Sequence, residues 1–595
     1  MKRFWLSLIL LIALGGLVYA NSLGNPFIWD DDNLIVSNPY IKDIRLLKNI
    51  FTKDLGYGTQ FSNFYRPLQS LSFELDYYLW GLNPRGYHFT NLILHIACAI
   101  ALYFLFSLTF IKSRFIPLIT AALFLVHPIQ TEAVTYISGR ADPLAGLFML
   151  LSLSLYIKSS RAKTRVYLYG AVGCFILALL SKEMALVLPV LLWLYDVSFA
   201  QKRSRRYLLF FAIALVYIIL RLTALNFVGM PVFSSADSLS LRLLTTLKIL
   251  ALYLGLLILP FNLHMERSIP TVSGLLEQDV LLALALFILL AILIVRGFKY
   301  SRIYFFGGLW FVICLLPFAN IIALNANMAE HWLYLASIGF FLLIAVGIDK
   351  LAAQGAPAKT AALILCAGLL GFYSFLTIQR NRDWRNPQSF FQSILAYSPK
   401  SAEAHNCLGA IYRDQGKLDL AVAEFKQAIK AQPQNFKCYG NLGATWRRQG
   451  KLDLAQEAYK QALALQPGIP GLYNNLGNIY VDKQDWPRAK EMFERALQLY
   501  PEFALCRVNL GKVYYETGKM DLALAEFKRA AALEPALVPA HYNLAVIYHL
   551  QQKYLEAINE YETALLLDPG HRQARFNLER AYKATGRRRT EEQAK

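Results

Sequence analysis

A period of 34 residues in the last third of the chain constrains the fold more than any other feature. An aromatic residue follows the recurring leucine four positions later, and prolines keep the same step from Pro399 to Pro569. Such a period indicates stacked helix–turn–helix units, because each unit buries its apolar face only against its neighbours. The sequence therefore predicts an α-solenoid over residues 402–585, with five full repeats and a closing helix, and a polar tail over 586–595. The recurring leucines are Leu408, Leu442, Leu476, Leu510, Leu544 and Leu578.

Units of this length are typical of tetratricopeptide repeats, whose stacked helices form a concave groove that binds extended peptides. An asparagine precedes five of the leucines, and the period places all five on one face. Their amides form a candidate ladder for an acceptor peptide backbone, similar to the ladder of the cytosolic N-acetylglucosamine transferase with such repeats. Asparagine is also common at this position of such repeats, where its side chain bonds to solvent or to its own helical turn. Both the peptide-binding and the structural interpretation therefore stay open. The asparagines are Asn441, Asn475, Asn509, Asn543 and Asn577.

Apolar runs of membrane length dominate the chain before residue 380. Because about 20 apolar residues cross the hydrocarbon, these runs predict an all-α fold: a polytopic membrane helical bundle with about eleven spans, followed by the solenoid. The stretch 244–260 is apolar enough to cross, but a simple crossing would invert every later loop. We therefore expect a re-entrant or interfacial segment there. The expected spans lie near residues 4–20, 90–110, 115–130, 143–158, 166–181, 184–199, 207–225, 279–296, 303–321, 332–349 and 358–378.

The positive charge of the chain, +20 at pH 7, gathers in short clusters between the apolar runs. Basic loops stay in the cytoplasm, so residues 21–88, 131–142, 181–183, 322–331 and everything after 380 are expected on the exoplasmic side. This distribution excludes a basic nucleic-acid surface. Seven cysteines without a CxxC pair predict neither a disulfide framework nor a zinc site. The expected domains are a membrane domain (1–380, with first exoplasmic loop 21–88), a connecting helix (381–401), the repeats (402–585) and the tail (586–595).

Three successive carboxylates follow the first apolar run, in the segment 27–39 (FIWDDDNLIVSNP). Apolar residues flank Asp30, Asp31 and Asp32 on both sides, so the loop can pack against the membrane domain. A partly desolvated carboxylate beside a cavity is a candidate general base, because desolvation raises its basicity. The alternative is a turn in which Asp32 or Asn33 caps a short helix.

Other ionisable residues gather at the exoplasmic ends of the apolar runs. Such groups are costly at membrane depth unless they pair or line a cavity, which makes them candidates for function. Together they predict an outward-facing pocket that holds a phosphate-bearing ligand and activates a nucleophile. Each also has a structural interpretation, such as an interhelical hydrogen bond or a helix cap. The candidates are Arg66, His88, His95, His127, Glu132, Arg140, Asp142, Lys182, Glu183, Arg221, Glu330 and His331.

Eight short motifs appear in a fixed order along the membrane part. Together with the repeats they resemble the transmembrane and tetratricopeptide-repeat-containing O-mannosyltransferases and their bacterial relatives, within the GT-C glycosyltransferases, over essentially the whole chain. One departure is His331, where the animal members have an arginine after the glutamate. The motifs are FIWDD (27–31), YRPL (65–68), GYH (86–88), NLILH (91–95), HPIQTEA (127–133), GRAD (139–142), SKE (181–183) and AEHWLYL (329–335).

The resemblance implies an inverting transferase that takes a sugar from a polyprenyl-phosphate donor and glycosylates hydroxyl groups of proteins outside the cytoplasm. By this analogy Asp30 or Asp31 supplies the base, and Arg66, Arg140 or Lys182 neutralises the leaving lipid phosphate. No cofactor and no metal is predicted, although the acidic triplet is able to bind a divalent ion. The expected protein is a multi-pass component of the plasma or inner membrane, with its repeats in the periplasm or lumen.

Two other functions remain open at this stage. The chain could be a non-catalytic membrane scaffold whose repeats recruit partners for envelope or secretion assembly. It could also transfer sugar to a glycan or lipid instead of a protein. A scaffold has no use for acids and bases that meet in one place, so the positions of the polar side chains discriminate between it and an enzyme.

Overall fold

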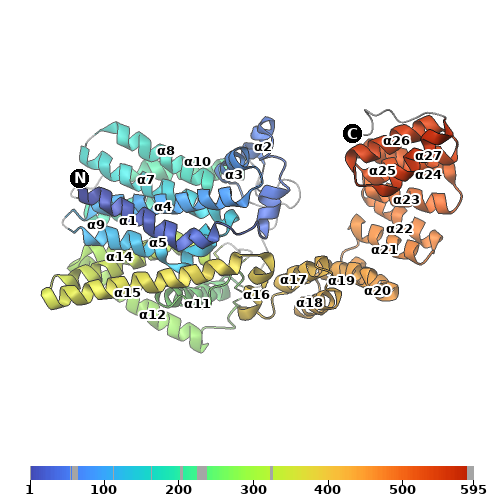
Figure 1. Ribbon diagram of the computed structural model, residues 1–595. Coiled ribbons are helices and arrows are strands. Elements are labelled where there is room, and N and C mark those ends of the chain that lie inside the picture. Colours follow the sequence, from blue (N-terminus) through green and yellow to red (C-terminus); the bar gives the residue numbers. More distant parts are fainter. Residues whose placement is uncertain are drawn as a thin grey trace. The chain divides into compact units, whose positions relative to one another are not determined.

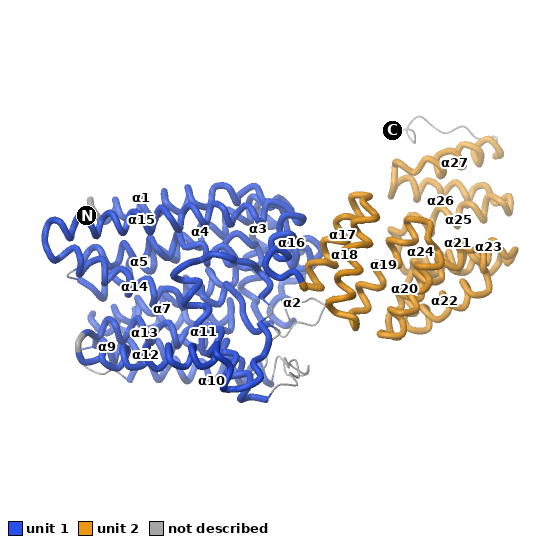
Figure 2. The backbone as a smooth tube through the Cα atoms, turned by 90° about the horizontal axis from the view of Figure 1, so that it is seen from below, with its two compact units in different colours: residues 1–399 blue, residues 400–595 orange. Residues whose placement is uncertain are grey.

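The computed structural model describes residues 2–53, 55, 64–111, 113–162, 164–200, 205–223, 238–267, 269–321 and 326–585. The predicted tail, 586–595, lies outside the described residues. The chain divides into two compact units, residues 1–399 and residues 400–595 (Figure 2). All regular elements of the described part are helices, which confirms the predicted all-α class.

The first unit is a bundle of long apolar helices that run side by side (Figure 1). A continuous apolar core joins them, and its largest buried side chains include Trp310, Tyr156 and Tyr334. Short helices fill the loops at one end of the bundle: α2 (Leu47–Thr52), α3 (Pro67–Trp80), α6 (Thr131–Val134) and α16 (Pro387–Tyr397). The long elements are α1 (Lys2–Tyr19), α4 (Pro84–Thr109), α5 (Phe115–Val126), α7 (Ala141–Ala162), α8 (Arg165–Ser181), α9 (Leu188–Phe199), α10 (Tyr207–Leu222), α11 (Leu239–Ile258), α12 (Gln278–Tyr300), α13 (Arg302–Leu315), α14 (Leu333–Ala352) and α15 (Ala356–Asn381).

Seven helical segments of the described part are long and apolar enough to cross a membrane. An eighth is formed if α5 and the bent continuation Pro128–Val134 are one span, and three shorter apolar segments begin at Arg165, Tyr207 and Arg302. The multi-pass membrane class is therefore supported, whereas the count of eleven spans stays a prediction.

Helix α11 covers most of the stretch 244–260, for which a re-entrant or interfacial segment is predicted. It is long enough to cross, but its polar groups bond to the connection between α13 and α14. Arg242 and Thr246 donate to the carbonyls of Asn320 and Ala319, and Tyr253 donates to that of Ala329. Helix α11 also packs against α12. The re-entrant or interfacial interpretation of this stretch stays a prediction.

The described part of the second unit, residues 400–585, consists of five helix pairs and a closing helix, α27 (Arg572–Ala584). Glycine at the repeated position is required by packing, since a Cβ on Gly409 would lie 2.8 Å from the Phe425 ring. Residues 381–401, the predicted connection, contain α16, which belongs to the first unit. The pairs are α17 (Ala402–Asp414) with α18 (Leu418–Ala431), α19 (Phe436–Arg448) with α20 (Leu452–Leu465), α21 (Pro470–Asp482) with α22 (Trp486–Leu499), α23 (Ala504–Glu516) with α24 (Met520–Leu533), and α25 (Val538–Leu550) with α26 (Tyr554–Leu567).

Candidate active site

The segment His127–Arg140, here called the central segment, joins α5 to α7 and is almost entirely buried. It folds as two 3-10 turns around α6. Gly139 is needed at its end, because a Cβ there would lie 2.4 Å from the carbonyl oxygen of Glu132. The side chains of the central segment reach the first loop, α14 and the end of α15, so segments far apart in sequence meet around it.

Asp31 is buried and faces the central segment. Its Oδ1 accepts hydrogen bonds from the backbone N–H and the hydroxyl of Ser138, at 2.9 and 2.5 Å, and its Oδ2 accepts the N–H of Ile28 at 2.9 Å. Burial raises the pKa of Asp31 to about 7, although these donors act to lower it. Asp31 therefore fastens the loop to the protein interior.

Asp30 has the opposite environment, because its side chain is exposed. The Tyr136 hydroxyl accepts the backbone N–H of Asp30 at 3.2 Å and is also hydrogen-bonded to its carboxylate. Tyr136 in turn stacks on Trp384, with ring centroids 5.3 Å apart. Of the two candidate catalytic carboxylates, only Asp30 is presented to the outside.

Trp29 holds the loop in a strained conformation, with φ +59°. Its ring packs on Phe390 and Phe391 of α16, with centroids 5.6 and 5.8 Å away. Non-glycine residues in this region cost free energy and persist where the surroundings impose them, as at functional sites. Directly after this residue, Asp30 is exposed and Asp31 is buried.

A first ionic cluster forms where α3 and α7 begin and α8 and α10 end. Arg66 makes two hydrogen bonds to Glu183, and Lys182 contacts both oxygens of Asp142 at 2.7 and 2.8 Å. Arg221 interacts electrostatically with Glu183. Burial acts to raise the pKa of Glu183, but Arg66, Arg221 and Lys182 outweigh burial and lower that pKa to about 2. The cluster thus holds three cations and two carboxylates.

A second ionic cluster surrounds the start of α14. Glu132 accepts hydrogen bonds from the ring Nδ1 and the backbone N–H of His331. The neighbouring Glu330 pairs with Arg267 at 2.8 Å and with Arg380 at 3.8 Å. The two arginines of this cluster balance its two glutamates, and the His331 ring is already bonded to Glu132.

The two clusters and the aspartate loop form a closed circuit of contacts. On one side, Gln69 lies one helical turn from Arg66 and donates to the carbonyl of Ser138. The backbone N–H of the same Ser138 donates to Asp31. On the other side, the turn Glu183–Val187 packs against Leu316–Phe318. Phe318 stacks on Trp332, beside His331, at 4.6 Å. These contacts link the segment of Asp30 to the acids and bases of both clusters.

Arg140, His88 and His127 differ from the prediction that they line the pocket. Arg140 is fully buried and pairs with Asp76 at 2.6 Å. His88 bonds to the carbonyl of Asn25, while His127 bonds to that of Leu257. All three ring or guanidinium groups are used inside the protein, so their role here is structural.

His95, also named as a candidate, bonds to the hydroxyl of Tyr334 and to the carbonyl of Leu125. It too is a buried core residue.

No group of three or more His, Cys, Asp or Glu side chains converges as a metal site among the described residues. The acidic triplet does not act as one ligand set, because Asp31 directs both carboxylate oxygens to N–H and O–H donors.

Three family models of the tetratricopeptide repeat match residues 400–467, 474–539 and 538–571. A protein O-mannosyl-transferase of Caenorhabditis elegans is 30% identical over 449 residues, which cover 71% of this chain and 62% of that protein. One of Xenopus laevis is 28% identical over 519 residues (70% and 61%), and a human one is 27% identical over 475 residues (68% and 63%).

The chain is similar to the protein O-mannosyl-transferases. The family resemblance predicted from the eight motifs is thereby confirmed, and the C-terminal part is a tetratricopeptide-repeat array. The chain spans about three fifths of the length of these relatives. Among solved structures, the repeats are similar to YrrB, a repeat protein with a peptide-binding site (TM-score 0.26, 20% identity, 32% of this chain and 97% of that one). They are also similar to TTC0263 of Thermus thermophilus (TM-score 0.28, 26% identity, 31% and 100%).

The five asparagines of the predicted ladder are all half-buried. The side-chain amides of Asn441 and Asn509 donate to the asparagines 35 residues earlier, at 2.9 Å, and thus link neighbouring repeats. Asn577 donates to the Tyr542 hydroxyl at 3.4 Å, and Asn543 donates within its own helix. These bonds favour the structural interpretation, and acceptor binding by the ladder, Asn475 included, stays a prediction.

Arg267, Arg380, Tyr136 and Ser138 complete the site but were not singled out in the sequence. Arg267 lies in an irregular loop and Arg380 near the end of an apolar helix, so neither belongs to a recognisable motif. Ser138 and Tyr136 lie between the HPIQTEA and GRAD motifs. The only signal in the sequence for Ser138 and Tyr136 is that they lie in the short gap between these two motifs.

The position of Asp31 predicts a pH dependence of stability. Between the ordinary carboxyl pKa near 4 and the native pKa near 7, the folded protein keeps a proton that the unfolded chain has lost. The stability from this group is complete below about pH 4 and disappears as the pH rises through about 7. Asp31→Asn is expected to reduce the difference in thermal stability between pH 5 and pH 8, measured on the solubilised protein. An unchanged difference would contradict this assignment.

Proposed function

We propose that the protein is a membrane glycosyltransferase that moves a sugar from a polyprenyl-phosphate donor to hydroxyl groups of proteins outside the cytoplasm. The names of its relatives support protein O-mannosylation as the reaction. The observation that carries the proposal is that the exposed Asp30 and the first ionic cluster lie in one circuit of contacts around the central segment.

Asp30 is assigned as the general base. An exposed carboxylate, fixed by Tyr136 and by the strained Trp29, can meet an acceptor hydroxyl arriving from solvent. Asp31 is assigned as the residue that positions it, since both its oxygens are bonded inside the protein.

The first ionic cluster is assigned to the donor phosphate, because its three cations exceed its two carboxylates. Arg221 lies in the last turn of α10, whose side chains Leu215, Val216, Ile219 and Leu222 are each at least half exposed. An apolar exposed helix that ends in a cation suits a lipid that brings its phosphate from the bilayer. Arg140, bonded to Asp76, is not assigned this role.

The reaction follows from these positions. Asp30 takes the proton of the acceptor hydroxyl, whose oxygen forms a bond to the anomeric carbon from the side opposite the phosphate. The bond from that carbon to the phosphate oxygen breaks, and the electron pair leaves with the lipid phosphate. The cations around Glu183 stabilise the charge that develops there. The reaction inverts the anomeric carbon and needs no metal.

The donor assignment predicts that Arg221→Gln and Arg66→Gln each raise the donor KM by about tenfold or more, because each removes a charge-assisted contact to phosphate. The measurement is transfer from polyprenyl-phosphate mannose to a protein acceptor by the full chain in liposomes. Arg205→Gln is the matched control, since Arg205 lies just before the opposite end of α10 and is exposed. Equal donor KM values in all variants would place the phosphate elsewhere.

A further inference from the structure

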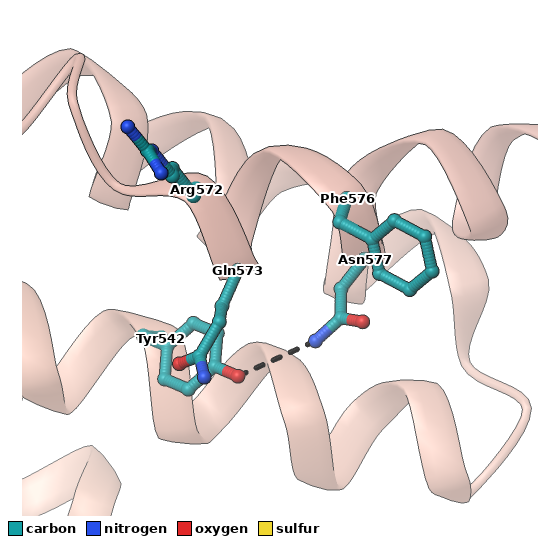
Figure 3. A pocket seen from close by; sticks show the side chains of 5 residues that line it. All are labelled: Tyr542, Arg572, Gln573, Phe576 and Asn577. Carbon is teal, nitrogen blue, oxygen red and sulfur yellow. Dashed lines mark hydrogen bonds between the residues drawn. The ribbon is translucent and has the colours of Figure 1, made fainter.

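A groove lies between α25 and α27, at the C-terminal end of the repeats (Figure 3). It has a volume of about 410 Å³ and is open to solvent. Tyr542 comes from the first helix of the last full repeat and the other lining residues from the closing helix. Figure 3 shows Gln573 and Asn577 reaching toward Tyr542, with Arg572 and Phe576 to either side. The lining residues are Tyr542, Arg572, Gln573, Phe576 and Asn577.

The groove combines an exposed aromatic side chain with a fixed one. Phe576 is 62% exposed, although a closing helix normally turns a polar face outward. The Tyr542 ring stacks on His571, with centroids 4.8 Å apart, and its hydroxyl accepts a hydrogen bond from Asn577. Exposed aromatic residues beside a rigid neighbour are typical anchors for a partner's apolar side chain.

The charge around the groove is positive. Helix α27 carries four basic residues and one acidic residue, and the Arg580 guanidinium lies 5.8 Å from the centre of the Phe576 ring. Burial and the charge of Arg580 both lower the pKa of His549 on α25. This end of the chain therefore complements an acidic partner.

Gln573 and Asn577 lie one helical turn apart, and each amide offers both a donor and an acceptor. An extended peptide presents N–H and C=O groups along its backbone that match such amides, whereas the phosphate of a lipid headgroup only accepts. The chemistry therefore favours polypeptide over membrane as the occupant.

We propose that this groove binds an extended acidic segment of the acceptor protein. An apolar side chain of the segment lies between Tyr542 and Phe576, and its carboxylates pair with Arg572 and Arg580. The proposal rests on the proposed function in one respect, that the bound segment belongs to the protein that receives the sugar. It adds a selection of acceptors by an acidic stretch away from the glycosylated hydroxyl.

The test is fluorescence anisotropy with the full chain in nanodiscs and no sugar donor. The probes are a labelled dodecapeptide of repeating Glu-Leu-Ser and its Lys-Leu-Ser counterpart. We expect the acidic peptide to bind at least about tenfold more tightly, and more weakly at high salt. Phe576→Ala and the double variant Arg572→Gln with Arg580→Gln should each weaken binding by about tenfold or more. Arg529→Gln, an exposed site on α24, is the matched control and should leave binding unchanged.

Equal binding of the two peptides would overturn the proposal, as would unchanged binding by the Phe576 and arginine variants. A third outcome would also overturn it: the variants bind the peptide normally but no longer bind phosphatidylserine vesicles. The surface would then contact membrane. The proposed function fails separately. If the wild-type chain binds the acidic peptide but transfers no sugar to any acceptor, the groove stands and the transferase assignment falls.

Discussion

Asp30→Asn is expected to lower the rate of sugar transfer by about 10²–10⁴-fold, the range associated with loss of a general base. The amide keeps the shape of the side chain and its contact with Tyr136, but it does not accept the proton of the acceptor hydroxyl. Because Asp30 is exposed and the loop is fastened by Asp31 instead, the variant should fold normally. The measurement is transfer at saturating donor, with thermal stability of the same preparation as a check on folding.

Asp32→Asn is the matched control, since all three carboxylates of the triplet are consecutive in sequence. Asp32 is exposed and begins the short helix Asp32–Val36, where its backbone carbonyl accepts from Ser37. Its loss should change the rate by no more than about twofold, as for surface substitutions away from a site. A rate in Asp30→Asn close to that of the wild type would remove the base from this loop. Loss of partner binding with sugar transfer intact would favour the scaffold interpretation.

The helical architecture follows almost directly from sequence pattern. A 34-residue period leaves one way to bury the repeated Leu, Gly and aromatic positions, so the helix pairs could be predicted. The apolar runs likewise predict membrane helices because lipid excludes other backbone structures. The span count does not follow from pattern alone, because α9 and α13 are short and α11 is bonded to the connection between α13 and α14.

The sequence motifs indicated which segments carry the candidate site residues, but not which of these residues are buried and structural and which are exposed. The motifs around Asp30 and Glu132 make contacts in the central segment, whereas Arg66 and Glu183 pair with each other. Sequence gives no measure of depth, however, and so it does not distinguish Arg140, bonded to Asp76 in the core, from Arg66 at the edge. The difference comes from tertiary contacts made 60 or more residues away along the chain.

The same limit applies to the aspartate pair and to the asparagines. Asp30 and Asp31 are adjacent and identical in chemistry, and only the tertiary contacts distinguish the buried Asp31, bonded to Ser138, from the exposed Asp30. The asparagine period predicts a shared face, but whether the amides face a ligand or one another depends on the spacing between stacked helices. In Asn441 and Asn509 that spacing brings the amides onto neighbouring repeats.

Arg140→Gln is expected to destabilise the first unit by about 3–5 kcal/mol, the cost of breaking a buried ion pair. The guanidinium pairs with Asp76 at 2.6 Å, donates to Asn91 and to the carbonyl of Tyr87, and lies over the Phe73 ring. Glutamine is too short to reproduce these contacts, so it leaves the Asp76 carboxylate buried and uncompensated. The measurement is the thermal unfolding transition of the solubilised full chain, which should move to a clearly lower temperature.

The double variant Arg140→Gln with Asp76→Asn separates lost charge pairing from lost packing. Because it leaves no uncompensated carboxylate, it should be less destabilised than Arg140→Gln alone. Arg45→Gln is the matched control: Arg45 pairs with Asp43 at 2.7 Å, but its side chain is 86% exposed, and its removal should leave the transition unchanged. If the destabilisation of the double variant equals the sum of those of Arg140→Gln and Asp76→Asn measured singly, the pair contributes through packing alone. A stable Arg140→Gln protein that has lost only donor affinity would instead return Arg140 to the phosphate site.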